Sequence, residues 1–493
     1  MSVKNIKFFR SPLEIIKSFS KVGWGILNTE ALPGVKARLR KSGKYFLLNW
    51  TGPGDIIPCS LPKAAYDNLL FELNGRKLIL EEVLDTSNIF LRHRGVKFTE
   101  NVNFFYSDGF SKESAYYFRL IIPLERKMNF HFQLERFSFE DDLGWLHAQG
   151  IRSKIEDDEL DVCLFHDGQK RSDYLSIEAT QLQTFNIFSE KAHAVINALG
   201  FITGYLAGNE GWYFAYEKDD LQYPNHFYHT PIRDSIYTAF TPVNTNPHAW
   251  IRDRRVADSL YDKKMLRVVG SDIFSNLCQK LYDSEDFSSA ILLMMEASGA
   301  SLIFRPGGYA IVLESLADLI TGKDKAKAPM NPALSKKVRG VLSEVVNSMC
   351  SELPTENREI LLGKINQLNQ VTNKSRLRVP FDELGICLNS KDLELIATRN
   401  DFLHGRIPDI TNAGDGLSTS RKNKNLYYAS VRFYTLLNRL ILAWVGYENY
   451  ILNHAKIQEK YTRILLEEDY YLPTFAEKAT EVKGSHKITE SPD

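Results

Sequence analysis

The pattern of hydrophobic and polar positions divides the chain into a strand-like part and a helical part. Up to about residue 230, short runs rich in Phe, Tyr, Ile and Leu alternate with turn residues such as Gly, Asp, Asn and Pro. Short apolar runs between turn signals are typical of β-strands in a sandwich or barrel. The strands are expected at residues 44–50, 76–84, 101–106, 115–124, 130–139, 160–165 and 174–185.

A different pattern begins near residue 256, where apolar side chains recur every three or four positions. This spacing gathers them on one face of a helix and predicts a bundle of five or six helices. The expected helices span residues 287–304, 309–322, 333–350, 358–372, 391–404 and 425–456. One further helix-like segment, 189–208, lies within the strand-rich part.

The two patterns together predict an α+β protein of two domains. Residues 1–255 are expected to form a β-rich, sandwich- or barrel-like domain, and residues 256–457 an all-α helical bundle. Residues 458–493 are expected to be a C-terminal extension whose polar end lacks the apolar content to fold. A length of 493 residues also exceeds the usual size of a single hydrophobic core.

Composition points to no particular ligand. The 61 basic and 61 acidic residues cancel, so net charge indicates neither nucleic acid nor a membrane. The five cysteines are scattered without a CxxC pair, which argues against a zinc site and fits a reducing cytoplasm. Asn438, Arg439 and Glu448 interrupt the most apolar late stretch, so a core helix is expected there rather than a membrane span. We expect a cytoplasmic protein with no cofactor and no bound metal.

The segment "IATRNDFLHGRIP" places polar side chains on a helix that should be largely buried. In a helix over residues 393–404, Arg399 takes a position in the apolar stripe where leucine is expected. Asn400 and His404 are four residues apart and therefore share a face. Gly405 predicts the end of this helix. The stripe itself consists of Leu395, Ile396, Phe402 and Leu403.

Two explanations fit a buried arginine at this position. In the first, Arg399 is structural and bonds a carboxylate within the bundle, because burial of an unpaired charge is costly. Glu314, in the apolar helix 309–322, is one candidate partner, although an exposed position is the alternative for it. In the second, Arg399 and His404 handle a phosphate, since arginine offers a planar fork of donors and histidine titrates near neutral pH.

The stretch "RNDFLH" resembles the R-N-x-x-x-H motif of the HEPN superfamily, whose compact helical domains often act as metal-independent ribonucleases. A β-rich part ahead of the helical part is similar to the Apea-type HEPN proteins of bacterial antiviral defence. The segments "GRKLILEEVLD" and "FQLERFSFEDDLGWLHAQGI" resemble strand-and-turn segments of their N-terminal domain. The resemblance covers the chain to about residue 457.

The resemblance implies an endoribonuclease in which the RNA 2′-hydroxyl attacks the adjacent phosphate. His404 would transfer the proton, Arg399 would stabilise the charge that develops on phosphorus, and Asn400 would orient His404 or bond the phosphate. HEPN domains commonly pair with their motifs facing each other, which would supply a second Arg–His set. We therefore expect a homodimer or higher even oligomer formed through the helical domain. The N-terminal domain would then sense infection or restrain the nuclease, and a phage-derived molecule would be the trigger. The substrate would be RNA, including transfer RNA.

Basic residues flank the motif and are candidates for RNA-phosphate binding, although solvated loop positions explain them equally well. They are Arg376, Arg378, Arg406 and Lys422. Two other functions remain open for the chain. One is a catalytically inactive HEPN module that binds RNA, a nucleotide or a partner protein, with Arg399 holding the bundle together. The other is the toxin of a toxin–antitoxin pair, which would share the chemistry and differ in regulation.

Overall fold

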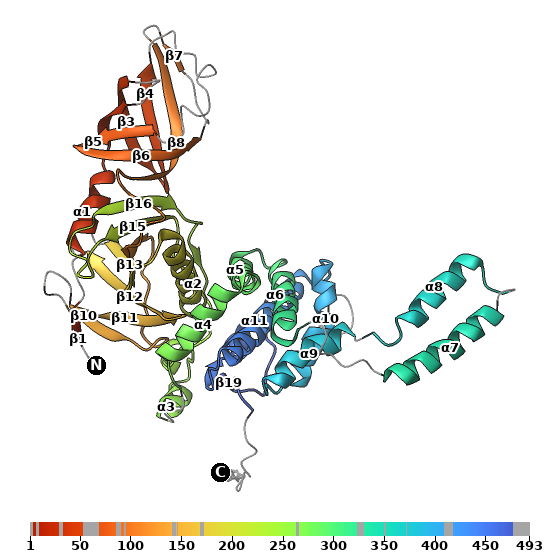
Figure 1. The fold of residues 1–493 in the computed structure, drawn as a ribbon. Coiled ribbons are helices and arrows are strands. Elements are labelled where there is room, and N and C mark those ends of the chain that lie inside the picture. The colour runs from red at the N-terminus through yellow and green to blue at the C-terminus, as the bar shows by residue number, and fades with distance from the viewer. Residues whose placement is uncertain are drawn as a thin grey trace. The chain divides into compact units, whose positions relative to one another are not determined.

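A computed structural model of the chain divides it into two compact units. Unit 1 comprises Met1–Gly299 and unit 2 comprises Ala300–Asp493. Unit 1 is rich in strands and unit 2 in helices, which confirms the α+β, two-domain organisation (Figure 1). The structure describes residues 3–5, 9–28, 33–52, 69–84, 90–92, 95–140, 144, 146–167, 172–262, 266–322, 330–349, 352–370, 372–408 and 418–476.

The division falls after Gly299, later than the change of pattern predicted at residues 255/256. Three helices that follow that change belong to unit 1, where α4 packs on β11 and on α2, and α5 packs on α2. The buried faces of α4 and α5 are therefore covered within the β-rich unit. The three helices are α3 (Arg254–Asp262), α4 (Ser271–Asp283) and α5 (Glu285–Gly299).

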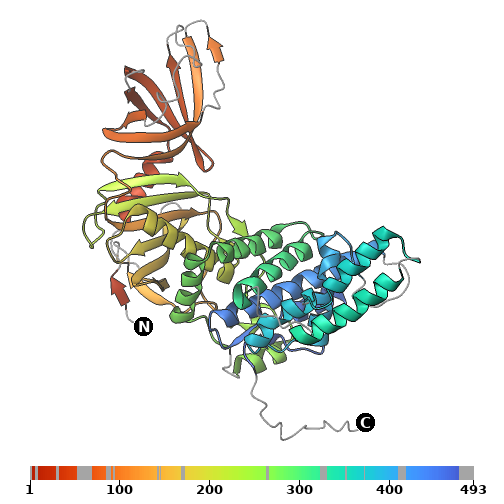
Figure 2. The same ribbon diagram turned by 45° about the vertical axis from the view of Figure 1, so that its right-hand side comes forward.

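The first part of unit 1 is a closed six-stranded barrel (Figures 1 and 2). Its strands pair in the order β8-β4-β3-β2-β5-β6, and a further pairing of β6 with β8 closes the ring. Alternate side chains point inward, so Ala37, Leu39 and Leu48 are buried. The strands are β2 (Gly23–Asn28), β3 (Pro33–Ser42), β4 (Tyr45–Gly52), β5 (Leu69–Leu73), β6 (Arg76–Leu84) and β8 (Gly95–Ser107), with β7 (Phe90–Arg92) beside β8.

The second part of unit 1 is an eight-stranded sheet that continues from the barrel through the pairing of β16 with β8. Its order is β1-β10-β11-β12-β13-β9-β15-β16. The strands are β1 (Val3–Asn5), β9 (Tyr117–Leu124), β10 (Phe137–Glu140), β11 (Leu146–Ile155), β12 (Asp158–Asp167), β13 (Ser172–Ala179), β15 (Glu210–Tyr216) and β16 (His226–Pro231). The expected strand at 130–139 is wrong over its first half, which forms a turn. The remaining elements are α1 (Arg10–Phe19), α2 (Phe185–Thr203), β14 (Tyr205–Leu206) with β17 (Ile236–Tyr237), and a 3₁₀ turn at Pro247–Ala249.

Helix α1 joins the barrel to the sheet through aromatic contacts. The ring of Phe19 lies 5.1 Å from that of Phe105 in the barrel and 5.4 Å from that of Trp212 in the sheet. His229 is fully buried in the same cluster, 4.7 Å from the Phe105 ring, and burial lowers the pKa of its imidazole. The barrel and the sheet thus share one hydrophobic core.

A buried ion pair lies in this sheet. Nε of Arg119 on β9 donates to Oε1 of Glu178 on β13 at 2.9 Å, and the two residues are cross-strand partners. Arg119 is fully buried, with its guanidinium 4.9 Å from the centre of the Phe9 ring. Burial raises the pKa of Glu178 even though Arg119 opposes the shift. The pair therefore stays charged only while both partners remain in place.

In unit 2, α6 (Arg305–Thr321) contacts three other helices, α9 (Asn373–Glu383), α10 (Ser390–Leu403) and α11 (Thr419–Trp444). The predicted final helix, 425–456, is too long: α11 ends at Trp444, and Gly446 turns the chain with a φ of 88°. The chain then forms β18 (Tyr450–Leu452), α12 (His454–Ile457), α13 (Glu459–Thr462) and β19 (Tyr471–Pro473), which pairs with β18. The tail predicted to be disordered, 477–493, lies outside the described residues.

Two predicted bundle helices are present but do not join the bundle. α7 (Pro332–Ser348) and α8 (Thr355–Asn366) pack on each other as a hairpin that extends away from the rest of unit 2 (Figure 1). Their side chains are mostly exposed, with Ser335 and Ile365 as the buried residues. Among the helices that the structure describes, none is both long and apolar enough to cross a lipid bilayer.

Replacement of Arg119 by methionine should destabilise unit 1 by about 3 kcal/mol at neutral pH, because the Glu178 carboxylate loses its cation. Since burial raises the pKa of Glu178, the loss should shrink as the pH falls and the carboxyl becomes protonated. Urea unfolding at pH 8 and pH 5, followed by tryptophan fluorescence, measures both effects. The exposed Lys127→Met is the control, and an equal loss in both variants would contradict a special role for the pair.

Candidate functional site

Helix α10 carries the RNxxxH motif, and its C-terminal end forms as the sequence predicts. Gly405 has a φ of 69°, and its N–H donates to the carbonyl oxygen of Phe402 at 3.1 Å. The N–H of Arg406 donates to the carbonyl oxygen of Asp401 at 2.7 Å, which completes a Schellman motif. Leu395, Ile396 and Phe402 of the predicted stripe are buried, and Leu403 is half-buried.

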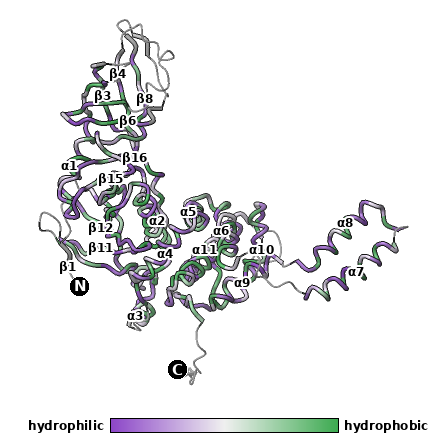
Figure 3. The backbone as a smooth tube through the Cα atoms, viewed as in Figure 1, coloured by the Kyte–Doolittle hydropathy of each residue, from purple (hydrophilic) through white to green (hydrophobic). Residues whose placement is uncertain are grey.

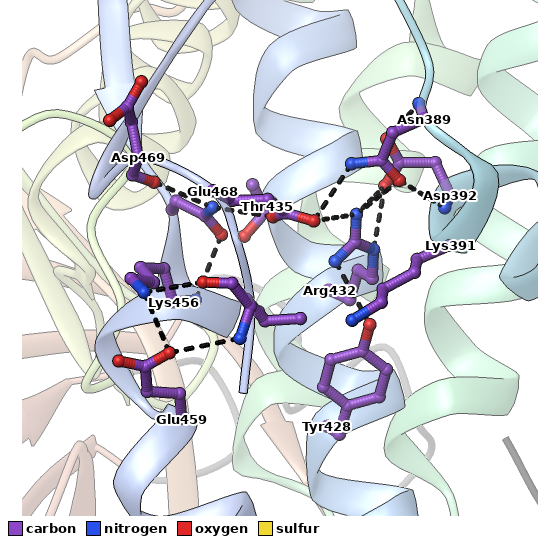
Figure 4. A network of polar contacts seen from close by, with 12 residues as sticks. Asn389, Lys391, Asp392, Tyr428, Arg432, Thr435, Lys456, Glu459, Glu468 and Asp469 are labelled. Carbon is purple, nitrogen blue, oxygen red and sulfur yellow. Dashed lines mark hydrogen bonds and ion pairs between the residues drawn. The ribbon is translucent and has the colours of Figure 1, made fainter. Parts of the chain in front are cut away.

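The N-terminal end of α10 is held by a network of buried charges (Figure 4). Asn389 and Asp392 form a capping box around the first turn. Nε of Arg432, from α11, donates to Oδ1 of Asp392 at 2.8 Å, and its Nη2 donates to Oε1 of Glu468 at 2.9 Å. The same guanidinium also bonds Asn389, and its Nη1 donates to the hydroxyl of Tyr428 at 3.1 Å.

The charges in this network stabilise one another. Burial alone would lower the pKa of Arg432, but the carboxylates of Asp392 and Glu468 outweigh it and raise that pKa. Burial would likewise raise the pKa of Glu468, yet Arg432 lowers it. For Tyr428, burial dominates and raises the pKa of the hydroxyl to about 12. The network therefore acts as a clamp that holds the first turn of α10 to α11 and to the segment that carries Glu468.

Arg399 lies in the packing face, as the sequence predicts, and is 2% exposed. Its Nε donates to Oε1 of Glu314 at 2.8 Å, so the partner suggested by the sequence is the one observed. Glu314 comes from α6, which approaches α10 closely: a Cβ on Gly307 would lie 3.3 Å from the carbonyl oxygen of Phe402. The ion pair therefore spans a tight helix–helix contact.

The rest of the motif is accessible to solvent. Asn400 and His404 are both exposed. Nη2 of Arg399 is buried and has no hydrogen-bond partner among the described residues. The site thus offers an exposed imidazole and an exposed amide beside a guanidinium whose Nη2 lacks a hydrogen-bond partner among the described residues. Arginine and histidine are both present, but only His404 is open to a ligand without movement of side chains.

The four basic residues proposed for phosphate binding do not form one patch of free charge. Arg376, on α9, lies 3.3 Å from Asp318 of α6, and Arg378 lies 3.0 Å from Asp382 on its own helix. Arg406 is exposed and 3.8 Å from Asp401, and Lys422 is exposed in the first turn of α11. Arg376 and Arg378 lie on α9, so the alternative that they are solvated loop positions is wrong for these two. Glu314 and Asp318 are one turn apart, so α6 pairs with both Arg399 and Arg376 along one face.

Sequence reasoning missed the clamp around Arg432, although part of its signal is present. Asn389-x-x-Asp392 ahead of the apolar "LELI" run has the spacing of a capping box. The contribution of Glu468 has no local signal, because it comes from a segment after α11. Within the described residues, no group of three or more His, Cys, Asp or Glu side chains is placed to hold a metal ion.

Comparison of the chain with protein-family models, curated proteins and solved structures found no match. The resemblance to the HEPN superfamily therefore rests on the RNxxxH motif and the order of the domains.

Replacement of Arg399 by alanine should lower the free energy of unfolding of unit 2 by about 2–4 kcal/mol, because Glu314 loses its partner and a cavity opens. Faster hydrogen exchange of the α10 amides would locate the effect. Arg378→Ala, which removes an exposed pair on the neighbouring helix, should cost no more than about 0.5 kcal/mol. Equal losses in the two variants would contradict a structural role for the Arg399–Glu314 pair.

Proposed function

We propose that the chain is a metal-independent endoribonuclease of the HEPN type that acts in the cytoplasm in bacterial antiphage defence. The observation that carries the proposal is the exposure of His404 and Asn400 on one face of α10, next to Arg399. The setting in antiviral defence rests on the resemblance of the motif and of the domain order alone. RNA, including transfer RNA, is the proposed substrate.

In the proposed reaction, the 2′-hydroxyl of a ribose attacks the adjacent phosphorus. The O2′–P bond forms, the P–O5′ bond breaks, and the proton lost from O2′ is balanced by a proton gained at O5′. The products carry a 2′,3′-cyclic phosphate and a 5′-hydroxyl. His404 would transfer one of these protons, and Asn400 would bond the phosphate or orient the imidazole. Arg399 would stabilise the developing charge if a shift of its side chain turned Nη2 toward the phosphate.

A catalytically inactive HEPN module is the second candidate, and a specific observation favours it. Arg399 is buried and paired with Glu314, as expected of an arginine whose role is only structural. In that case the exposed His404 has no chemical partner, and the module binds RNA, a nucleotide or another protein. In the ribonuclease, replacement of His404 alone should abolish RNA cleavage, whereas the inactive module cleaves no RNA with or without His404.

We propose that two copies associate through the α7–α8 hairpin, which leaves large apolar side chains exposed. Hydrophobic and hydrophilic positions alternate along both helices (Figure 3). Val341 is 54% exposed, Val345 50% and Leu334 47%, and Ile360 on α8 is 52% exposed. Their spacing on α7 forms the stripe of a helix that packs on another helix.

The charges of the hairpin fit an antiparallel partner. Its base, residues 330–340 and 360–370, has four cations and no acid, a net charge of +4. Its tip, residues 341–359, has four glutamates and one arginine, a net charge of −3. In a two-fold symmetric, antiparallel pair, each tip lies against the base of the other copy. The base cations are Lys336, Lys337, Arg339 and Lys364, and the tip acids are Glu344, Glu352, Glu356 and Glu359.

Purified protein should cleave single-stranded RNA or transfer RNA in the presence of EDTA, and His404→Ala should reduce the rate at least about 100-fold. His248→Ala, which removes another exposed histidine, should leave the rate unchanged. Protein from phage-infected and uninfected cells should be compared by gel electrophoresis of the products. Thermal melts should show that both variants remain folded.

The ribonuclease would be contradicted if neither preparation cleaved RNA, while Arg399→Ala lowered the melting temperature and His404→Ala left it unchanged. That result would favour the inactive module.

Sedimentation equilibrium should show a dimer that Val341→Glu with Val345→Glu converts to a monomer. Lys336→Glu with Lys337→Glu should weaken the dimer, and so should Glu356→Lys with Glu359→Lys. A chain carrying all four charge reversals should regain it, because tip and base are again complementary. An oligomer that none of these variants disturbs would contradict the hairpin interface.

A further inference from the structure

The outer face of the barrel in unit 1 carries a row of cations. On β3, Lys36, Arg38 and Arg40 alternate with the buried Ala37 and Leu39. Alternate residues of a strand share a face, so the three cations point outward at intervals of about 6.7 Å. That interval is comparable to the separation of successive phosphates in an extended single strand of nucleic acid.

Strand register places an aromatic ring next to these cations. Trp24 on β2 lies opposite Arg38, Arg38 lies opposite Asn49 on β4, and Asn49 lies opposite Thr99 on β8. Trp24 is 67% exposed, and the Arg38 guanidinium lies 5.8 Å from the centre of its ring. Thr99 donates from Oγ1 to Oδ1 of Asn49 at 2.8 Å. One line of side chains thus crosses four neighbouring strands, with an exposed ring at one end.

The cations and the ring line a hollow of about 360 Å³, to which Lys97 of β8 adds a fourth positive charge. None of the four cations forms an ion pair with a described residue, whereas most buried or half-buried cations elsewhere in unit 1 do. Nε of Arg38 is buried and has no hydrogen-bond partner among the described residues. The nearby acid Glu100 points to the inside of the barrel, where it accepts from the indole N–H of Trp50 at 3.2 Å. The hollow is therefore positive, with a donor that lacks an acceptor.

We propose that this face of β2, β3, β4 and β8 binds single-stranded nucleic acid. Trp24 stacks on a base, and Lys36, Arg38, Arg40 and Lys97 bind successive phosphates. An exposed aromatic ring among cations on a small barrel suits a single strand, because only unpaired bases offer a face to stack on. A chain of zero net charge requires such a local patch for any contact with nucleic acid. The site lies in unit 1 and does not depend on RNA cleavage.

Fluorescence anisotropy of the full-length protein with labelled 12-nucleotide single strands tests the proposal. Oligo-dT is the first probe because it lacks the 2′-hydroxyl and cannot be cleaved by the proposed reaction, and oligo-U is the second. Both should bind, and tighter binding of oligo-U would identify RNA as the preferred strand. A duplex of the same length should bind at least about 10-fold more weakly than either.

Trp24→Ala should weaken binding about 10-fold or more, whereas Trp24→Phe should retain most of it because a ring remains. Arg38→Ala should weaken binding and reduce the slope of log affinity against log salt by about 0.7, the value for one phosphate contact on a single strand. Lys77→Ala removes an exposed cation elsewhere on the barrel and is the matched control.

Three results would overturn the proposal: no binding by the wild type, equal binding of the duplex, or losses in Trp24→Ala and Arg38→Ala no larger than in Lys77→Ala. None of them bears on RNA cleavage by unit 2, and failure of cleavage would leave binding of oligo-dT unaffected. The two proposals can therefore fail separately.

Discussion

The burial of two arginines against carboxylates is the constraint on which unit 2 depends. Arg432 clamps the first turn of α10 to α11 through Asp392, and Arg399 ties the last turns of α10 to α6 through Glu314. Each guanidinium would be costly to bury without its carboxylate, so α10 is held in one position along its length. The chain ends the helix immediately afterwards, at Gly405, which leaves the face of Asn400 and His404 toward solvent.

The same constraint limits the chemistry that the motif can perform. Because Arg399 is buried and donates from Nε to Glu314, its guanidinium reaches a phosphate beside His404 only if the side chain shifts. Its buried Nη2 has no hydrogen-bond partner among the described residues, a cost that a bound phosphate would remove. In the proposed reaction His404 transfers a proton at one position, so a second proton-transfer group has to complete the balance.

Local features of this fold could be predicted from the sequence, and non-local ones could not. The strand at 76–84 and the helix carrying "RNDFLH" are present because turn signals and periodicity act over a few residues. Apolar periodicity correctly predicted that α7 and α8 are helices. It does not show what covers their apolar faces, so the prediction that they belong to the bundle was wrong. The closure of β6 on β8 and the pairing of Arg432 with Glu468 join distant segments and leave no local signal. The alternating Lys36, Arg38 and Arg40 were visible in the sequence, yet their meaning depends on the register that brings Trp24 beside them.

The most direct test of the account is the chemical identity of the ends of cleaved RNA. Products formed in EDTA would be treated with a kinase and a phosphatase, separately and together, and analysed by mass spectrometry. We expect 2′,3′-cyclic phosphate and 5′-hydroxyl ends, because in the proposed reaction the ribose hydroxyl is the nucleophile and no metal-bound water takes part. Products with 3′-hydroxyl and 5′-phosphate ends, or no cleavage by protein from infected cells, would contradict it.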